Sequence, residues 1–142
     1  MHNQKFKNYK LILLIFYLIP YIVLYSISRL FFDDLYLFKW MSDRLYLCIW
    51  IVVLLLAYTN KYWIASFLTF ASIAGVIFGQ FLGDFIRFNN IKLITSMMAK
   101  EEQARLYLHQ GVPIWILTVF ILTLIGIALE IIKKKRNENY KS

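Results

Sequence analysis

The sequence predicts an all-α fold: an integral membrane four-helix bundle with amphipathic interfacial helices between spans 1 and 2 and between spans 3 and 4. Three observations favour this class. Of the 142 residues, 61% are hydrophobic, whereas soluble domains are about 45–50% apolar. The apolar residues fall into four long runs. The net charge of +8 is therefore confined to tails and loops, which suits a membrane with anionic lipid and leaves no soluble basic domain for nucleic acid.

The first span covers about residues 11–28, which is long enough to cross the hydrocarbon core. Pro20 lies inside this span and predicts a kink, which neighbouring helices in a bilayer can accommodate. A second interpretation stays open, because the run follows Lys5, Lys7 and Lys10 and could be a cleaved signal peptide. The run is long for the apolar part of a signal peptide, so a spanning helix is favoured.

The segment 29–44 mixes aromatic and charged residues, which predicts an amphipathic helix lying in the membrane interface. The second span covers about residues 42–58. Its fully apolar part, residues 45–58, makes only about 21 Å of helix. The span must therefore include the residues before it, with Arg44 reaching back to the interface. Cys48, the only cysteine, is expected to be a small buried hydrophobic residue and cannot form an intramolecular disulfide.

A polar turn at residues 59–61 leads into the third span, about residues 62–83. The segment 84–110 mixes charges with apolar residues at helical spacing and predicts one or two amphipathic helices against the membrane. The fourth span, about residues 112–132, begins near Pro113 and stops at the basic run 133–136. No linker-like segment or internal repeat interrupts the chain, so we expect a single membrane domain, residues 1–142.

Four spans place both termini on one face of the membrane. That face carries nine of the lysines and arginines, and the opposite face carries seven together with six acidic residues. The dense cations directly flank the first and last spans at Lys10 and Lys133. Because positively charged segments stay on the inner side, we expect a multi-pass protein of the cell membrane with both termini in the cytoplasm.

Small residues recur every four positions along the third span and form one stripe on a helix: Ala71, Gly75, Gly79 and Gly83. Such a GxxxG-type stripe lets a second backbone approach closely, so it predicts a helix-packing groove. Two partners fit the groove. One is the fourth span, through Gly126, and the other is the same helix of a second copy. Packing within the chain is the preferred alternative.

Five polar residues are candidates for a role beyond packing: Gln80, Asp84, Arg87, His109 and Glu130. Gln80 lies at membrane depth and should face protein or water. Asp84 and Arg87 are three residues apart and can pair on a helix, whereas Glu130 can pair with the lysines that follow it. His109 suits a pH-sensing or helix-capping residue at least as well as a metal ligand.

Catalytic motifs do not appear in the sequence. It contains no glycine-rich phosphate loop, serine elbow, HExxH or paired cysteines, and no metal-ligand spacing. Glu101 and Glu102 are adjacent, so their carboxylates point in different directions on a helix. The sequence therefore predicts no cofactor and no metal, and it favours a role other than catalysis.

The second half of the chain resembles small uncharacterised multi-pass membrane proteins of low-GC Gram-positive bacteria. The shared features are the glycine-rich span, Ile114 and Trp115 near the start of the last span, and Gly126, Ile127 and Glu130 before a basic tail. The resemblance implies a membrane protein of this kind and no particular activity.

Three functions are compatible with these patterns. The preferred one is association, as a homo-oligomer or as an accessory or immunity-type subunit of a membrane assembly, with anionic lipid at the basic tails and no nucleic acid. The first alternative is a small transporter or channel, which predicts that Gln80, Asp84 and Glu130 line one polar path. The second is a membrane enzyme on a lipid-like substrate, which predicts that Asp84, Arg87 and His109 converge at the interface.

Overall fold

The structure is a computed structural model that describes residues 2–139, with side chains from residue 9 onward, and this part contains helices and no strand. Three helices are long and apolar enough to cross a membrane: α1 (His2–Leu30, apolar over Tyr9–Leu30), α4 (Tyr62–Ile91) and α6 (Gly111–Asn139). The side chains of Lys5 and Lys7 and residue Lys141, which contribute to the predicted basic tails, lie outside the described part.

The remaining elements are short. A fourth candidate span is a bent pair, in which α2 (Tyr36–Asp43) is followed by the 3-10 turn η1 (Leu45–Cys48) and α3 (Ile49–Tyr58). The last short helix is α5 (Lys100–Tyr107). The described chain therefore has three helices able to span a membrane, or four if the bent pair is one span, as expected of a multi-pass membrane protein.

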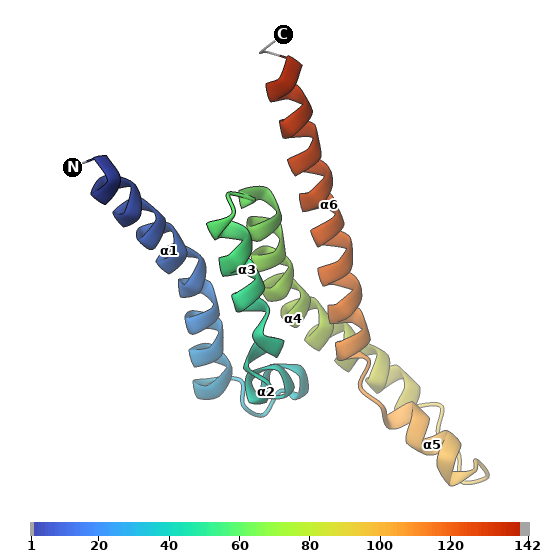
Figure 1. Ribbon diagram of the computed structural model, residues 1–142. Coiled ribbons are helices and arrows are strands. Elements are labelled where there is room, and N and C mark those ends of the chain that lie inside the picture. The colour runs from blue at the N-terminus through green and yellow to red at the C-terminus, as the bar shows by residue number, and fades with distance from the viewer. Residues whose placement is uncertain (1, 140–142) are drawn as a thin grey trace.

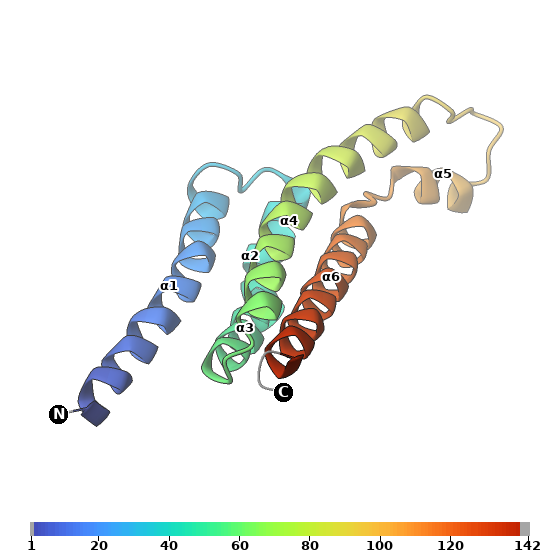
Figure 2. The same cartoon turned by 90° about the horizontal axis from the view of Figure 1, so that it is seen from above.

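The helix α4 occupies the centre of the arrangement. It packs against α6 along one side and against α3 and α2 on the other, and α1 packs on α2 and α3. Figure 2 shows α1 and α6 on opposite sides of the group formed by α2, α3 and α4. The start of α1 and the end of α6 lie at the same end of the molecule (Figure 1). Pro20 lies inside α1, which stays helical through it.

The second span differs from the continuous helix that the sequence predicts. It bends by 57° between α2 and the segment Leu45–Tyr58. All four residues of η1 have positive φ, from 47° to 57°. Left-handed backbone costs residues with a side chain about 1–2 kcal/mol each, so the surrounding contacts must hold this turn. Tyr46 is one such anchor, since it is 2% exposed and bonds Ser28 through its hydroxyl.

Two expectations for this region need correction. The amphipathic helix before the second span is present as α2, but its apolar side is buried in the protein core through Leu37, Phe38 and Met41. Cys48 was expected to be buried, and this prediction is wrong, because Cys48 is exposed at the start of α3. Cys48 is itself one of the left-handed residues of the turn, so it does not belong to a continuous apolar helix as the sequence predicted.

The predicted third span is shorter than the helix that contains it. No glycine or proline follows Gly83 before residue 91, so α4 continues to Ile91 and is about 45 Å long. The chain then turns over residues 92–99 and returns through α5. Residues 85–108 form an arm that projects beyond the other helices (Figure 1). The amphipathic segment predicted over residues 84–110 therefore forms two helical parts, the end of α4 and the separate helix α5.

The glycine stripe of α4 faces α6, the internal partner, and at Gly79 also α2. A Cβ atom at Gly75 would lie 2.8 Å from Trp115 Cδ1, and one at Gly79 would lie 2.7 Å from the carbonyl oxygen of Gly111. Ala71 is fully buried on the same stripe. On α6, a Cβ at Gly126 would lie 2.9 Å from Phe67 Cβ, near the start of α4. The backbones approach so closely that side chains larger than hydrogen do not fit at these glycines.

We predict that Gly79→Ala destabilises the protein by about 1–3 kcal/mol, because the new methyl group meets the backbone of Gly111 and forces the helices apart. The matched control is Phe78→Ala on the adjacent, 56% exposed position. Reversible unfolding in mixed micelles, followed by circular dichroism, measures both. Equal stability of the two variants would contradict the close packing at Gly79.

Candidate functional site

Gln80 is the buried centre of a hydrogen-bond chain at one end of the spans. Its side chain is 1% exposed. The amide oxygen accepts the backbone N–H of Leu37 at 2.7 Å, and the amide nitrogen donates to Asp84 Oδ2 at 2.6 Å. The N–H of Leu37 belongs to the first turn of α2, where the helix itself offers no partner. Gln80 therefore caps α2 from α4, and both ends of its amide are satisfied.

His109 continues the chain from Asp84 to α6. Its Nε2 lies 3.2 Å from Asp84 Oδ1, and its Nδ1 accepts the backbone N–H of Gly111 at 3.0 Å. Because Nδ1 is an acceptor, we assign the proton of the neutral ring to Nε2, which donates to the carboxylate. The side chain of His109 is 3% exposed, whereas that of Asp84 is 48% exposed. The ring of Tyr36 packs on the imidazole at 4.5 Å between centroids.

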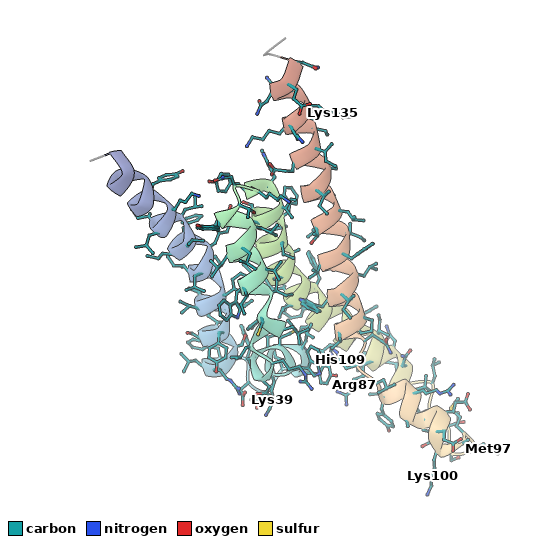
Figure 3. The ribbon with its side chains drawn as sticks, in the orientation of Figure 1. Lys39, Arg87, Met97, Lys100, His109 and Lys135 are labelled. Carbon is teal, nitrogen blue, oxygen red and sulfur yellow. The ribbon has the colours of Figure 1, made fainter. Side chains whose placement is uncertain are left out.

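We call Gln80, Asp84 and His109 the clasp. Asp84 is the last residue of α4 before the arm, and His109 follows the arm directly, so their hydrogen bond joins the two ends of residues 85–108. Figure 3 shows His109 and Arg87 where the arm leaves the other helices. Gly83 is needed here, because a side chain at this position would meet the imidazole of His109. The glycine stripe thus also makes room for the clasp.

Burial lowers the pKa of His109 from its ordinary value of about 6.5, because a buried imidazolium loses its hydration. The carboxylate of Asp84 opposes this effect and raises the pKa, and the positive charge of Arg87 adds a smaller lowering. The desolvation effect is the largest. His109 is therefore neutral at neutral pH, as the hydrogen bond from Gly111 to its Nδ1 requires.

The other two candidate residues lie outside the clasp. Arg87 is exposed on the first turn of the arm, and within residues 9–139 it makes no ion pair with Asp84. Glu130 caps the opposite end of α4, where its Oε2 accepts the N–H of Trp63 at 3.2 Å. Trp63 and Asp84 are 21 residues apart on α4, or about 30 Å. Glu130 therefore lies at the end of α4 opposite to Gln80 and Asp84.

The chemistry available to the clasp is limited by its own hydrogen bonds. Both ring nitrogens of His109 are engaged, so no lone pair is available to take a proton from a substrate in this geometry. Among residues with described side chains, no group of three or more histidine, cysteine or acidic residues could hold a metal ion. The arrangement is that of a pair of helix caps linked by one carboxylate.

Sequence reasoning identified all three clasp residues but missed Tyr36 and Leu37, which complete their surroundings. Neither residue carries a local signal, because the backbone N–H of Leu37 and the ring of Tyr36 matter only once α2 folds against α4. Comparison with protein-family models, with curated proteins and with solved structures gives no match.

We expect Gln80→Leu to lower the stability of the spans by about 1–3 kcal/mol, since it leaves the buried N–H of Leu37 without an acceptor. The same substitution at Gln103 is the control, because that amide bonds only carbonyls near the arm tip, including Met98 O at 3.0 Å. Unfolding in mixed micelles compares the two. If both variants unfold alike, Gln80 does not have the capping role that we assign to it.

A second prediction concerns pH. The folded clasp holds His109 with a lowered pKa, so the opened state takes up a proton first as the pH falls below about 6.5. The stability contributed by neutral His109 is complete above that pH and is lost progressively toward the lowered pKa. Hydrogen exchange of the Gly111 amide, corrected for its intrinsic rate, should rise several-fold on acidification.

The control for this experiment is His109→Asn, whose side-chain oxygen can accept the N–H of Gly111 but does not titrate in this range. Exchange at Gly111 in that variant should show no such rise. A pH response of the same size in both proteins would mean that another group is responsible.

Proposed function

We propose that the protein acts by association, as a four-span membrane bundle that presents the arm to another membrane protein or to a second copy of itself. The clasp is the observation that supports this proposal. Gln80, Asp84 and His109, three of the side chains that could have formed a reaction site or a polar path, are instead engaged with backbone groups and with each other at the base of the arm. Such a network fixes the direction in which the arm leaves the spans.

The surface of the arm suits a contact with protein. Large apolar side chains on it are exposed, including Phe85 (64%), Phe88 (61%) and Met97 (97%). Lysines and arginines lie among them and outnumber the two glutamates by two. Figure 3 shows Met97 and Lys100 at the far tip of the arm. Exposed aromatic and methionine side chains mixed with cations are typical of interaction surfaces.

The predicted orientation determines where this contact occurs. With both termini in the cytoplasm, the arm lies on the outer face of the cell membrane, and the exposed run Lys133–Arg136 lies on the inner face against anionic lipid. An accessory or immunity-type subunit with this arrangement would shield or stabilise a partner from outside. A homo-oligomer would place two arms side by side.

Site-specific photo-crosslinking in native membranes tests the proposal. We expect a crosslinker at Met97 to give one defined protein adduct, either a dimer of this chain or a single partner. A crosslinker at Ile12, which is 66% exposed on α1, is the control and should label lipid. Asp84→Ala should reduce the Met97 adduct several-fold, because the arm loses its fixed base.

The negative result is equally clear. If Met97 labels only lipid and the chain is monomeric after mild extraction, the arm is not a protein contact. If the adduct forms equally well in Asp84→Ala, association does not depend on the clasp.

A further inference from the structure

A groove of about 320 Å³ lies between α1 and the break in the second span. This volume is at the lower end of the range of small-molecule sites. Seven side chains line it: Leu18, Tyr21, Ile22, Tyr25, Leu45, Tyr46 and Trp50. The hydroxyl of Tyr21 donates to Ser72, and that of Tyr46 pairs with Ser28, so both hydroxyls point into the protein core. The groove therefore presents aromatic rings and hydrocarbon.

The groove coincides with the strained part of the backbone. Leu45 and Tyr46 belong to the left-handed turn η1, and Trp50 belongs to the first turn of α3. Four consecutive residues with positive φ are energetically costly, and such strain concentrates where a ligand or a moving part needs it. The break places Leu45, Tyr46 and Trp50 beside α1 as one wall of the groove.

The position of the groove along α1 matches one leaflet of a bilayer. Its lining on α1 extends from Leu18 to Tyr25, and Arg29 follows one turn later. Leu18 and Arg29 are eleven positions apart, or about 16 Å of helix, which is close to half of the roughly 30 Å hydrocarbon core. A lipid whose headgroup lies at the level of Arg29 would therefore place one acyl chain along the groove.

Three cations lie in the sequence between the groove residues of α1 and those of η1, and one of them makes no ion pair with any residue whose side chain is described. Arg29 pairs with Asp43 at 2.7 Å, and Lys39 pairs with Asp33 at 3.7 Å. Arg44, which directly precedes Leu45, makes no ion pair within residues 9–139.

Arg44 is held in place without losing its capacity to bind an anion. Its guanidinium stacks on the ring of Trp40 at 4.2 Å and donates one hydrogen bond to the Trp40 carbonyl. The other N–H groups of the guanidinium remain available, and guanidinium N–H groups commonly bind phosphate. Asp34, the remaining acid of this loop, precedes α2, whereas Arg44 follows it.

We propose that the groove binds one phospholipid, with an acyl chain against Ile22 and Trp50 and its phosphate on Arg44. The acyl chain fills the hollow beside the break, and the phosphate neutralises the unpaired guanidinium. This site lies at the α1 edge of the molecule, whereas the arm leaves from α4 and α6 on the other side (Figure 2).

Native mass spectrometry of the full chain in detergent micelles tests the site. The probes are phosphatidylglycerol and a diacylglycerol with the same acyl chains. We expect one lipid per chain and a preference for the phospholipid of about tenfold, as a charge-assisted phosphate contact gives. Arg44→Gln should reduce this preference to about twofold, whereas Lys39→Gln should leave it unchanged, because Lys39 already pairs with Asp33.

The acyl part of the site has its own matched pair of variants. Ile22→Trp fills the groove and should lower retention of both lipids about tenfold. Ile19→Trp puts the same ring on an exposed position of α1 that does not line the groove, and it should behave as the wild type. Helical circular dichroism and elution volume verify that both variants are folded.

Three outcomes would overturn the proposal. The first is a wild-type chain that retains no lipid, and the second is equal retention by the two tryptophan variants. The third is a wild-type chain that holds diacylglycerol as firmly as phosphatidylglycerol, which would remove the phosphate from the site.

Discussion

A bilayer offers no water to backbone groups, and this constraint governs the centre of the molecule. The helix α2 begins inside the protein, where the N–H of Leu37 would otherwise lack a partner, and Gln80 provides its acceptor. The same amide holds Asp84, which holds His109, which caps α6. One polar chain therefore connects three helices. The link from Leu37 to Gln80 is fully buried, so breaking it leaves an unsatisfied group that water cannot reach, whereas Asp84 is 48% exposed.

Close helix packing makes this chain geometrically possible. Because Gly79 and Gly83 carry no side chain, α6 can begin against the backbone of α4, and the imidazole of His109 can lie over Gly83. The break in the second span is the other consequence of tight packing. The helix α2 turns its apolar side into the core, and the left-handed residues of η1 then redirect the chain into α3.

The two proposed surfaces follow from these two features. The clasp fixes the base of an arm with exposed aromatic residues, which suits association with a protein. The break leaves an apolar groove, and Arg44, which directly precedes the lining residue Leu45, makes no ion pair within residues 9–139, which suits a phospholipid. Glu130 serves a third purpose at the opposite end, where it caps α4. Gln80, His109 and Glu130 each accept an N–H from the first turn of a helix, so these polar groups mainly define the shape of the chain.

The sequence by itself determined that the chain is helical, the approximate position of its three long apolar helices and the packing role of the glycine stripe, since span length and helical spacing are local properties. It also identified Gln80, Asp84 and His109, because polar residues beside apolar runs are conspicuous. Only the tertiary structure decided that Asp84 meets His109, 25 residues away, and that Glu130 bonds Trp63 and not the neighbouring lysines. The break at η1 was equally hidden, because no glycine or proline marks it and the strain is carried by contacts from distant helices.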